Sequence, residues 1–263
     1  MSGVSGLFPR GLLPAALAVV VLCPLPALAY RPFDGTDAAV AAKGEVELEL
    51  GPVGFEKDGP SRTLVAPSAV LNLGVTGRAE LVLEGRQVIQ LGDRIDGPRS
   101  RVDDVALSFK TVLREGSLQE QAGVSVASEL SALLPATDGG VGAELAVIAS
   151  RRWPELTVHL NGAATWTRAH RPGLAGGAIF EVHDAWALRP VAEVRVQGER
   201  DEPTVVSGLA GAIWRLRDGV SLDAGLRVAR EGGVSATELR AGLTWGFDAG
   251  LGRSPDVGRA QSK

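Results

Sequence analysis

Cysteine is almost absent from this chain. Of its 263 residues one is a cysteine, Cys23, and it lies in an apolar N-terminal stretch. A lone thiol cannot form an intramolecular disulfide or supply the clustered thiolates of a structural zinc site. Histidine is also scarce, since His159, His170 and His183 are the three in the chain and no two have the spacing of metal ligands. We therefore expect no disulfide framework, no metal and no cofactor.

A strong charge of one sign is missing as well. The formal net charge is −4, and the sequence contains no long basic run. Nucleic-acid-binding proteins usually carry a concentrated positive patch, so a nucleic-acid partner is not expected. The glycine-rich run at 173–177 lacks the lysine of a phosphate-binding loop, which argues against nucleotide binding.

Long hydrophobic runs are absent with one exception, although the mean hydropathy of +0.12 is high for a chain with 22% charged residues. Residues 11–29 alone approach the roughly 20 apolar residues that a membrane-spanning helix needs. Arg10 precedes this run, which ends in the small-x-small sequence Ala27-Leu28-Ala29, as in a secretory signal. Prolines inside the run argue against the alternative, a membrane anchor. We predict a signal peptide at 1–29, and hence a mature chain without cysteine.

The clearest pattern that is present is strict alternation, best seen at 234–247. Leu243, Trp245 and Phe247 share one parity of this stretch, whereas Glu238 and Arg240 share the other. Side chains of a strand point alternately to its two faces, so one face is apolar and the other polar. The apolar face would look into the core of a soluble sandwich, or outward into lipid in an outer-membrane barrel whose polar face lines the lumen.

The same alternation recurs between Glu45 and Phe247 and predicts about twelve strands. We expect them at 45–50, 68–76, 79–86, 105–114, 122–130, 141–149, 156–167, 178–183, 186–197, 204–216, 222–228 and 234–247. Connections after the even-numbered strands look short, and most of the others look longer and more polar, notably 51–62, 91–103 and 168–177. An even strand number with short turns at one end and long loops at the other is typical of a bacterial outer-membrane barrel.

Two observations favour the barrel over the sandwich. Many residues on the apolar parity are small, which lipid tolerates but which would leave cavities in a sandwich core about 10 Å thick; they include Gly162, Ala164, Gly208, Ala210 and Ala212. Aromatic residues lie near strand ends, where the membrane interface of a barrel is expected. The predicted interface aromatics are Trp153, Trp166, Trp186, Trp214, Trp245 and Phe247.

The sequence thus predicts an all-β protein, a transmembrane antiparallel up-and-down β-barrel at 45–247. A polar lead-in at 30–44 without clear periodicity precedes it. The tail at 248–263, rich in glycine, serine and charge, is expected to be disordered.

The polar parity supplies the candidate functional residues. The predicted lumen-lining residues are Glu84, Arg86, Lys110, His159, Glu193, Arg195, Asp223, Arg227, Glu238 and Arg240. Three same-strand pairs among them, Glu193/Arg195, Asp223/Arg227 and Glu238/Arg240, allow two interpretations. They either line a passage whose mixed charges set selectivity, or neutralise one another and plug the interior. His159 is expected as a polar lumen residue and not as a general base, because no His-x-Ser element accompanies it.

The strands at 206–214, 220–227 and 238–247 resemble the last three strands of a family of bacterial outer-membrane barrels labelled as transporters of the MetA pathway of phenol degradation, and 150–163 is similar to the middle of such proteins. The resemblance implies residence in the lipid of a Gram-negative outer membrane and passage of small solutes, aromatic or hydrophobic ones among them. Leu243-Thr244-Trp245-Gly246-Phe247 is also similar to the signal read by the outer-membrane assembly machinery, which implies that machinery as a partner during biogenesis.

The function that we expect is therefore passive diffusion of small solutes through a charged lumen, without catalysis. The alternative is a non-transporting structural or surface-interaction barrel. A membrane enzyme and a soluble periplasmic β protein rank third and fourth.

Overall fold

The computed structural model describes residues 31–59, 61–92, 98–136, 139–182 and 185–250. The predicted signal peptide, His183 and most of the predicted tail lie outside these ranges. The described chain forms twelve strands: β1 (Glu45–Asp58), β2 (Ser61–Thr76), β3 (Ala79–Leu91), β4 (Ser100–Arg114), β5 (Ser125–Leu133), β6 (Gly142–Arg152), β7 (Leu156–Trp166), β8 (Pro172–Val182), β9 (Leu188–Glu199), β10 (Val205–Arg217), β11 (Val220–Glu231) and β12 (Val234–Asp248).

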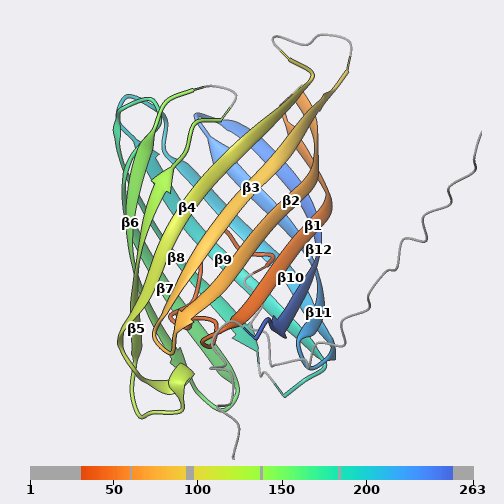
Figure 1. Ribbon diagram of the computed structural model, residues 1–263. Helices are drawn as coiled ribbons and strands as arrows, with labels where there is room; N and C mark the ends of the chain where they lie inside the picture. Colours follow the sequence, from red (N-terminus) through yellow and green to blue (C-terminus); the bar gives the residue numbers. More distant parts are fainter. Residues whose placement is uncertain (1–30, 60, 93–97, 137–138, 183–184, 251–263) are drawn as a thin grey trace, which may run out of the picture.

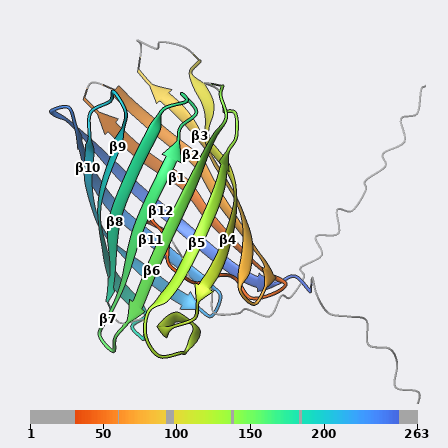
Figure 2. The same ribbon diagram turned by 90° about the vertical axis from the view of Figure 1, so that its left-hand side faces the viewer.

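The strands close into one barrel. Each pairs antiparallel with its neighbours in the chain, and β1 completes the ring by pairing with β12, from Glu45 opposite Asp248 to Asp58 opposite Ala236. Figures 1 and 2 show the strands tilted and joined into one closed wall. The predicted twelve-stranded up-and-down barrel is confirmed. Because β1 begins and β12 finishes at one rim, we call that rim the terminal end and the opposite rim the loop end.

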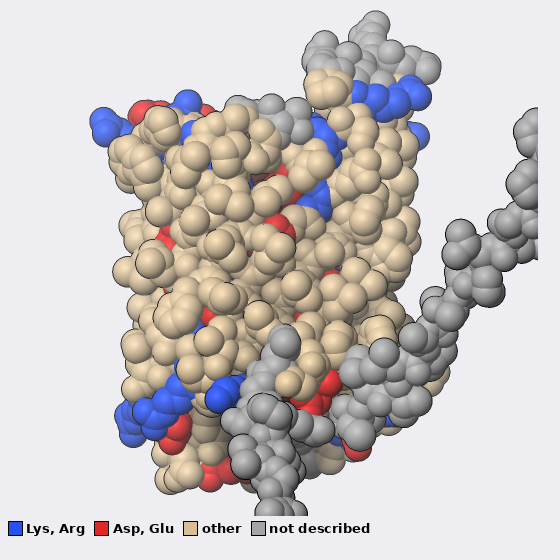
Figure 3. Space-filling view, in the orientation of Figure 1, with Lys and Arg blue, Asp and Glu red and all other residues tan. Residues whose placement is uncertain are grey.

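The outer surface is apolar, as the alternation predicts. Leucines and valines from the whole circumference are exposed, Leu160 at 55%, Val194 at 55% and Leu239 at 55% among them. In the face shown in Figure 3, charged side chains gather toward the two rims and leave a broad band of other residues between them. All five tryptophans, Trp153, Trp166, Trp186, Trp214 and Trp245, are exposed. Such a surface suits lipid, where a closed barrel satisfies every backbone group internally. Among the described residues, no helix is long and apolar enough to cross a membrane.

Three predicted connections are wrong. The stretch 51–62 is mostly strand, because a bulge between Leu50 and Val53 absorbs Gly51 and Pro52 and lets β1 continue to Asp58. The stretch 168–177 contains the first half of β8, which begins at Pro172. A Cβ on Gly177 would lie 2.8 Å from the carbonyl oxygen of Val194, so this glycine serves close packing of the wall and not a turn.

The third is the connection after β4, predicted to be a short turn. It runs from residue 115 to 124 and contains a 3₁₀ helix, η1 (Ser117–Gln119). The side-chain amide of Gln119 donates to the backbone oxygen of Ala38 at 2.9 Å, so this connection reaches a residue that precedes the barrel. The terminal end therefore carries a structured element where the sequence predicts only a turn.

Candidate functional site: the lumen and its inserted segment

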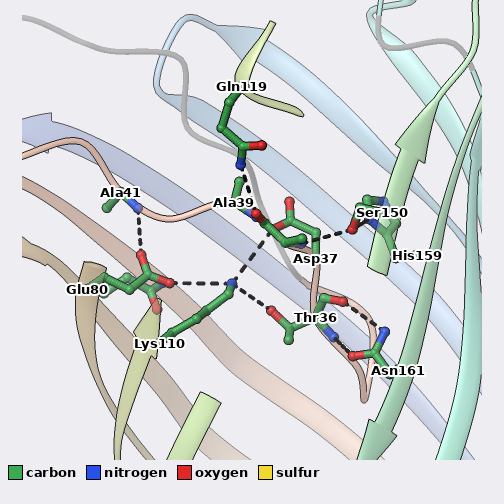
Figure 4. Close-up of polar contacts among 12 residues, drawn as sticks. Thr36, Asp37, Ala39, Ala41, Glu80, Lys110, Gln119, Ser150, His159 and Asn161 are labelled. Carbon is green, nitrogen blue, oxygen red and sulfur yellow. Dashed lines mark hydrogen bonds and ion pairs between the residues drawn. The ribbon is translucent and has the colours of Figure 1, made fainter. Parts of the chain in front are cut away.

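Residues 31–44, predicted as a polar lead-in, lie inside the barrel. We call them the inserted segment. Their partners come from all sides of the ring: Glu49 on β1, Glu80 on β3, Ser150 on β6, Asn161 on β7, Glu193 on β9 and Arg240 on β12. Ala38 is completely buried. Figure 4 shows the segment surrounded by side chains of the wall. Because the segment contacts β1, β6 and β9 on different sides of the closed barrel, it lies in the middle of the lumen.

The wall binds this segment mainly through its backbone. The Glu193 carboxylate accepts hydrogen bonds from the backbone N–H groups of Asp34 and Gly35, both at 2.8 Å. Asn161 accepts one from the N–H of Thr36 at 3.0 Å and donates one to its carbonyl at 2.9 Å. Four more N–H groups find wall side chains: Arg31 N to Glu49 Oε2 (3.2 Å), Ala38 N to Ser150 Oγ (2.9 Å), Ala41 N to Glu80 Oε2 (2.6 Å) and Ala42 N to Glu45 Oε2 (2.9 Å). Buried backbone donors need such acceptors, and charged acceptors bind them more strongly.

Asp34 forms the most highly charged contact of the segment. Its carboxylate accepts from Nε of Arg227 at 2.7 Å and from Nη2 of Arg240 at 2.6 Å, while Nη1 of Arg240 donates to the backbone oxygen of Pro32 at 2.7 Å. Burial inside the lumen raises the pKa of Asp34, but the two guanidinium groups lower it by more, so it lies below its usual range. The carboxylate is therefore ionised at neutral pH and clamped between two strands, β11 and β12.

Lys110 anchors the segment on the opposite side. Its side chain is 1% exposed, and Nζ lies 3.4 Å from Glu80 Oε1, 3.7 Å from Asp37 Oδ1 and 3.1 Å from the hydroxyl of Thr36 (Figure 4). A buried ammonium is costly unless it is paired and hydrogen-bonded. Here one wall carboxylate and two groups of the segment surround it, so Lys110 needs the segment to complete its environment.

Ser150, His159 and Glu181 form a polar chain across β6, β7 and β8. Nδ1 of His159 lies 2.8 Å from Oγ of Ser150, Nε2 lies 3.2 Å from Oε1 of Glu181, and Arg189 pairs with the same carboxylate at 3.2 Å. The order serine, histidine, carboxylate is that of a nucleophile activated by a base. Here, however, Ser150 is fully buried and its oxygen accepts the N–H of Ala38, so an acyl substrate has no access to it. This network of polar side chains therefore serves to hold the inserted segment.

Glycines on the inner face leave the space that the segment fills. A Cβ on Gly74 would collide with the backbone oxygen of Ala42, and one on Gly242 would collide with the Arg31 side chain. On Gly51 it would lie 2.8 Å from the guanidinium of Arg31. The inner face of the wall therefore complements the inserted segment in shape as well as in charge.

Two cavities of about 240 and 290 Å³ remain beside the tip of the segment. Phe33 and Asp34 line both. The smaller is bordered by the carboxylates of Glu84, Glu129 and Glu144, and by Arg195. Three carboxylates around one cavity give it an excess of negative charge on that side.

The ten predicted lumen residues divide into two groups. Lys110, Glu193, Asp223, Arg227 and Arg240 contact the inserted segment directly. The others contact wall residues or line cavities: His159 in its polar chain, Arg86 paired with Asp104 at 2.8 Å, Glu238 with Arg240 at 2.8 Å, and Glu84 and Arg195 at the smaller cavity.

Of the three predicted same-strand pairs, one is present as an ion pair, Glu238 with Arg240. Glu193 instead accepts backbone N–H groups of the segment, Asp223 faces Arg31 at 3.4 Å, and Arg227 faces Asp34. Of the two interpretations left open for these pairs, mutual neutralisation on one strand thus holds for Glu238 and Arg240, whereas Glu193, Asp223 and Arg227 pair with residues 31–35.

The sequence analysis missed the segment itself. Its residues Arg31, Asp34, Thr36 and Asp37 and the wall residues Ser150, Asn161 and Glu181 were not among the candidates. The available signal was indirect: the wall carries many more inward carboxylates than cations, and the polar lead-in contains small residues, Gly35 and the alanines at 38, 39, 41 and 42, that fit a narrow space. In the described ranges, no group of three or more histidine, cysteine, aspartate or glutamate residues is arranged to hold a metal ion.

Comparison with known proteins reaches the fold alone. No family model and no curated protein sequence matches the chain. Among solved structures, the barrel is similar to the COG4313 outer membrane channel from Pseudomonas putida F1, with a TM-score of 0.61, 12% identity, and coverage of 82% of this chain and 100% of that one. It is also similar to the NanC porin (TM-score 0.57, 8% identity, 76% and 98% covered) and to the KdgM porin (TM-score 0.50, 8% identity, 76% and 98% covered). The chain therefore has the fold of small outer-membrane channels.

Proposed function

We propose that this protein is a passive outer-membrane channel for small solutes, without catalysis or cofactor. The observation that carries the proposal is a closed barrel with a lipid-compatible outside and a polar, partly hollow lumen, whose cavities of about 240 and 290 Å³ flank the segment tip. A barrel with a purely structural role would be more stable if side chains filled these cavities, so the cavities favour a channel. The polar lining favours small hydrophilic solutes. Passage of aromatic or hydrophobic solutes rests on the family resemblance alone.

The predicted signal peptide and the terminal-strand signal complete the proposal. Export through the inner membrane and insertion by the assembly machinery would place the terminal end in the periplasm. Solutes would then enter at the loop end and diffuse past the segment tip.

Planar-bilayer recordings test the proposal. We expect small, discrete conductance steps from purified protein whose mobility on an SDS gel changes on boiling, which identifies a closed barrel. Folded protein that never conducts would contradict the proposal.

A second candidate is a non-transporting structural or surface-interaction barrel. The observation that favours it is the inserted segment, because residues bonded to β1, β3, β6, β7, β9 and β12 occupy the middle of the passage. The same recordings separate the two candidates.

A further inference from the structure

The inserted segment is held in the lumen as a ligand is held, and not as part of the wall. Its backbone hydrogen bonds to the barrel backbone lie in its last three residues: Gly44 N donates to Gly74 O at 2.9 Å, Gly44 O accepts from Ala249 N at 3.0 Å, and Ala42 O accepts from Glu45 N at 2.9 Å. The rest of its polar backbone contacts go to side chains such as Glu193, Asn161 and Ser150. The wall, meanwhile, closes by its own ladder between β1 and β12. The segment can therefore leave the lumen without breaking any strand pairing.

The contacts also show where release would begin. The segment joins β1 at Glu45, on the terminal end, so this side is tethered by the chain itself. The tip at Phe33 and Asp34 borders both cavities, as does Arg31. It is held by Arg227 and Arg240, whose guanidinium groups bind the Asp34 carboxylate at 2.7 and 2.6 Å. Asp34 is the only carboxylate of the segment in contact with these two strands in the described structure, so its removal takes away both ion pairs at once.

We propose that residues 31–44 are a releasable plug, hinged at Gly44 and latched by Asp34 to Arg227 and Arg240. Seated, the plug borders both of the small cavities beside its tip. Its release would connect them into one passage. The inference rests on the proposed channel function for its consequence, but the movement of the plug can be measured independently of conductance.

Thiol labelling measures that movement. The mature chain is expected to lack cysteine, so Ala38→Cys introduces a single thiol at a completely buried position. We expect a water-soluble maleimide to label it slowly in the otherwise unchanged barrel and about tenfold faster when Asp34→Ala is added, since a charged hydrogen bond corresponds to roughly that factor or more. Glu155→Ala, which removes an exposed carboxylate in the β6–β7 turn, is the matched control and should leave the rate unchanged.

A reversible lock tests the consequence for the passage. Ala38→Cys with Ser150→Cys places two thiols where the N–H of residue 38 and Oγ of residue 150 lie 2.9 Å apart. In bilayers, this pair combined with Asp34→Ala should conduct little when oxidised. On reduction it should open to at least the level of Asp34→Ala alone, because Ser150→Cys also weakens the hydrogen bond to the N–H of Ala38. Every variant must first show the boiling-dependent mobility of a closed barrel.

The outcomes are distinguishable. Faster labelling together with larger, lock-sensitive conductance supports the plug and the channel. Faster labelling without conductance in any variant supports the plug and contradicts the proposed channel. Equal labelling rates with and without Asp34→Ala, or conductance that is insensitive to the lock, overturn the plug and leave the proposed channel standing if the wild type conducts.

Discussion

The two halves of the lumen differ although they are built from the same strands. Toward the terminal end, Lys110, His159 and Glu80 are at most 2% exposed. Lys110 and Glu80 bind the segment and each other, and His159 binds Ser150, which in turn accepts the N–H of Ala38. Toward the loop end, Glu84 is exposed and cavities remain. Both halves have walls of alternating strands with inward charges. They differ because the inserted segment, fourteen residues at 31–44 without alternation, fills the terminal half. The lesson is that lumen polarity is set by the wall, whereas lumen closure is set by what enters it.

The sharpest way to break this comparison is to remove the buried cation of the terminal half. Lys110→Met leaves Glu80 and Asp37 facing each other without their ammonium. Breaking a buried ion pair costs about 3–5 kcal/mol, so we expect the free energy of unfolding to fall by roughly that amount. Urea titration followed by gel mobility measures it.

Lys57→Met is the control for that prediction, because Lys57 is exposed near the loop end of β1. Its effect should stay within about 0.5 kcal/mol. An equal loss in both variants would show that charge in the wall, and not burial beneath the segment, decides stability.

A milder change tests one contact of the segment. Ser150→Ala leaves the N–H of Ala38 and Nδ1 of His159 without their shared partner. An unsatisfied buried donor costs about 1–3 kcal/mol, so amide hydrogen exchange over residues 31–44 should accelerate about tenfold or more. Ser131→Ala is the matched control, since Ser131 bonds Ser108 at 2.8 Å in the wall and should leave this exchange unchanged.

Acidification tests the latch. The pKa of Asp34 lies below its usual range, because Arg240 and Arg227 outweigh the opposing effect of burial. A depressed pKa gives stabilisation that is fully present above the ordinary value of about 3.9 and is lost as the pH falls through the lowered one. The protection factor of the segment amides, which is the intrinsic exchange rate at each pH divided by the measured rate, should therefore stay constant from neutral pH to about pH 4 and fall only below it. Asp34→Asn should show low protection factors throughout and lack this acid step, whereas a wild-type step near pH 6 would contradict the assignment.

The wall could be predicted from the sequence because it obeys a local rule. In strands such as 234–247 one parity must meet lipid and the other must not, so residue type alone reports the face. Strand boundaries were less predictable where Gly51-Pro52 and the glycines at 173–177 imitate turns. A bulge absorbs Gly51 and Pro52, and close packing against the backbone of Val194 requires glycine at position 177.

The occupied lumen could not be predicted by that rule. Glu193 and Asp223 read as lumen residues, but their partners are Asp34, Gly35 and Arg31, which lie about 160 to 190 residues away in sequence. Contacts made between wall side chains and an aperiodic backbone leave no pattern of spacing. Only the mismatch of inward charges indicates that something else must enter.

The smallest expected effect lies in the loop half, where solvent screens the charges. Glu84 and Glu144 border the cavity beside the segment tip, and carboxylates in a pore attract cations. We expect a modest cation preference, which the double change Glu84→Gln and Glu144→Gln should reduce by about twofold in permeability ratio, measured from the reversal potential in a salt gradient. The unfolding free energy should barely move, because these side chains do not hold the segment. A large loss of stability would mean that the loop half is packed as tightly as the terminal half, and the contrast between them would then fail.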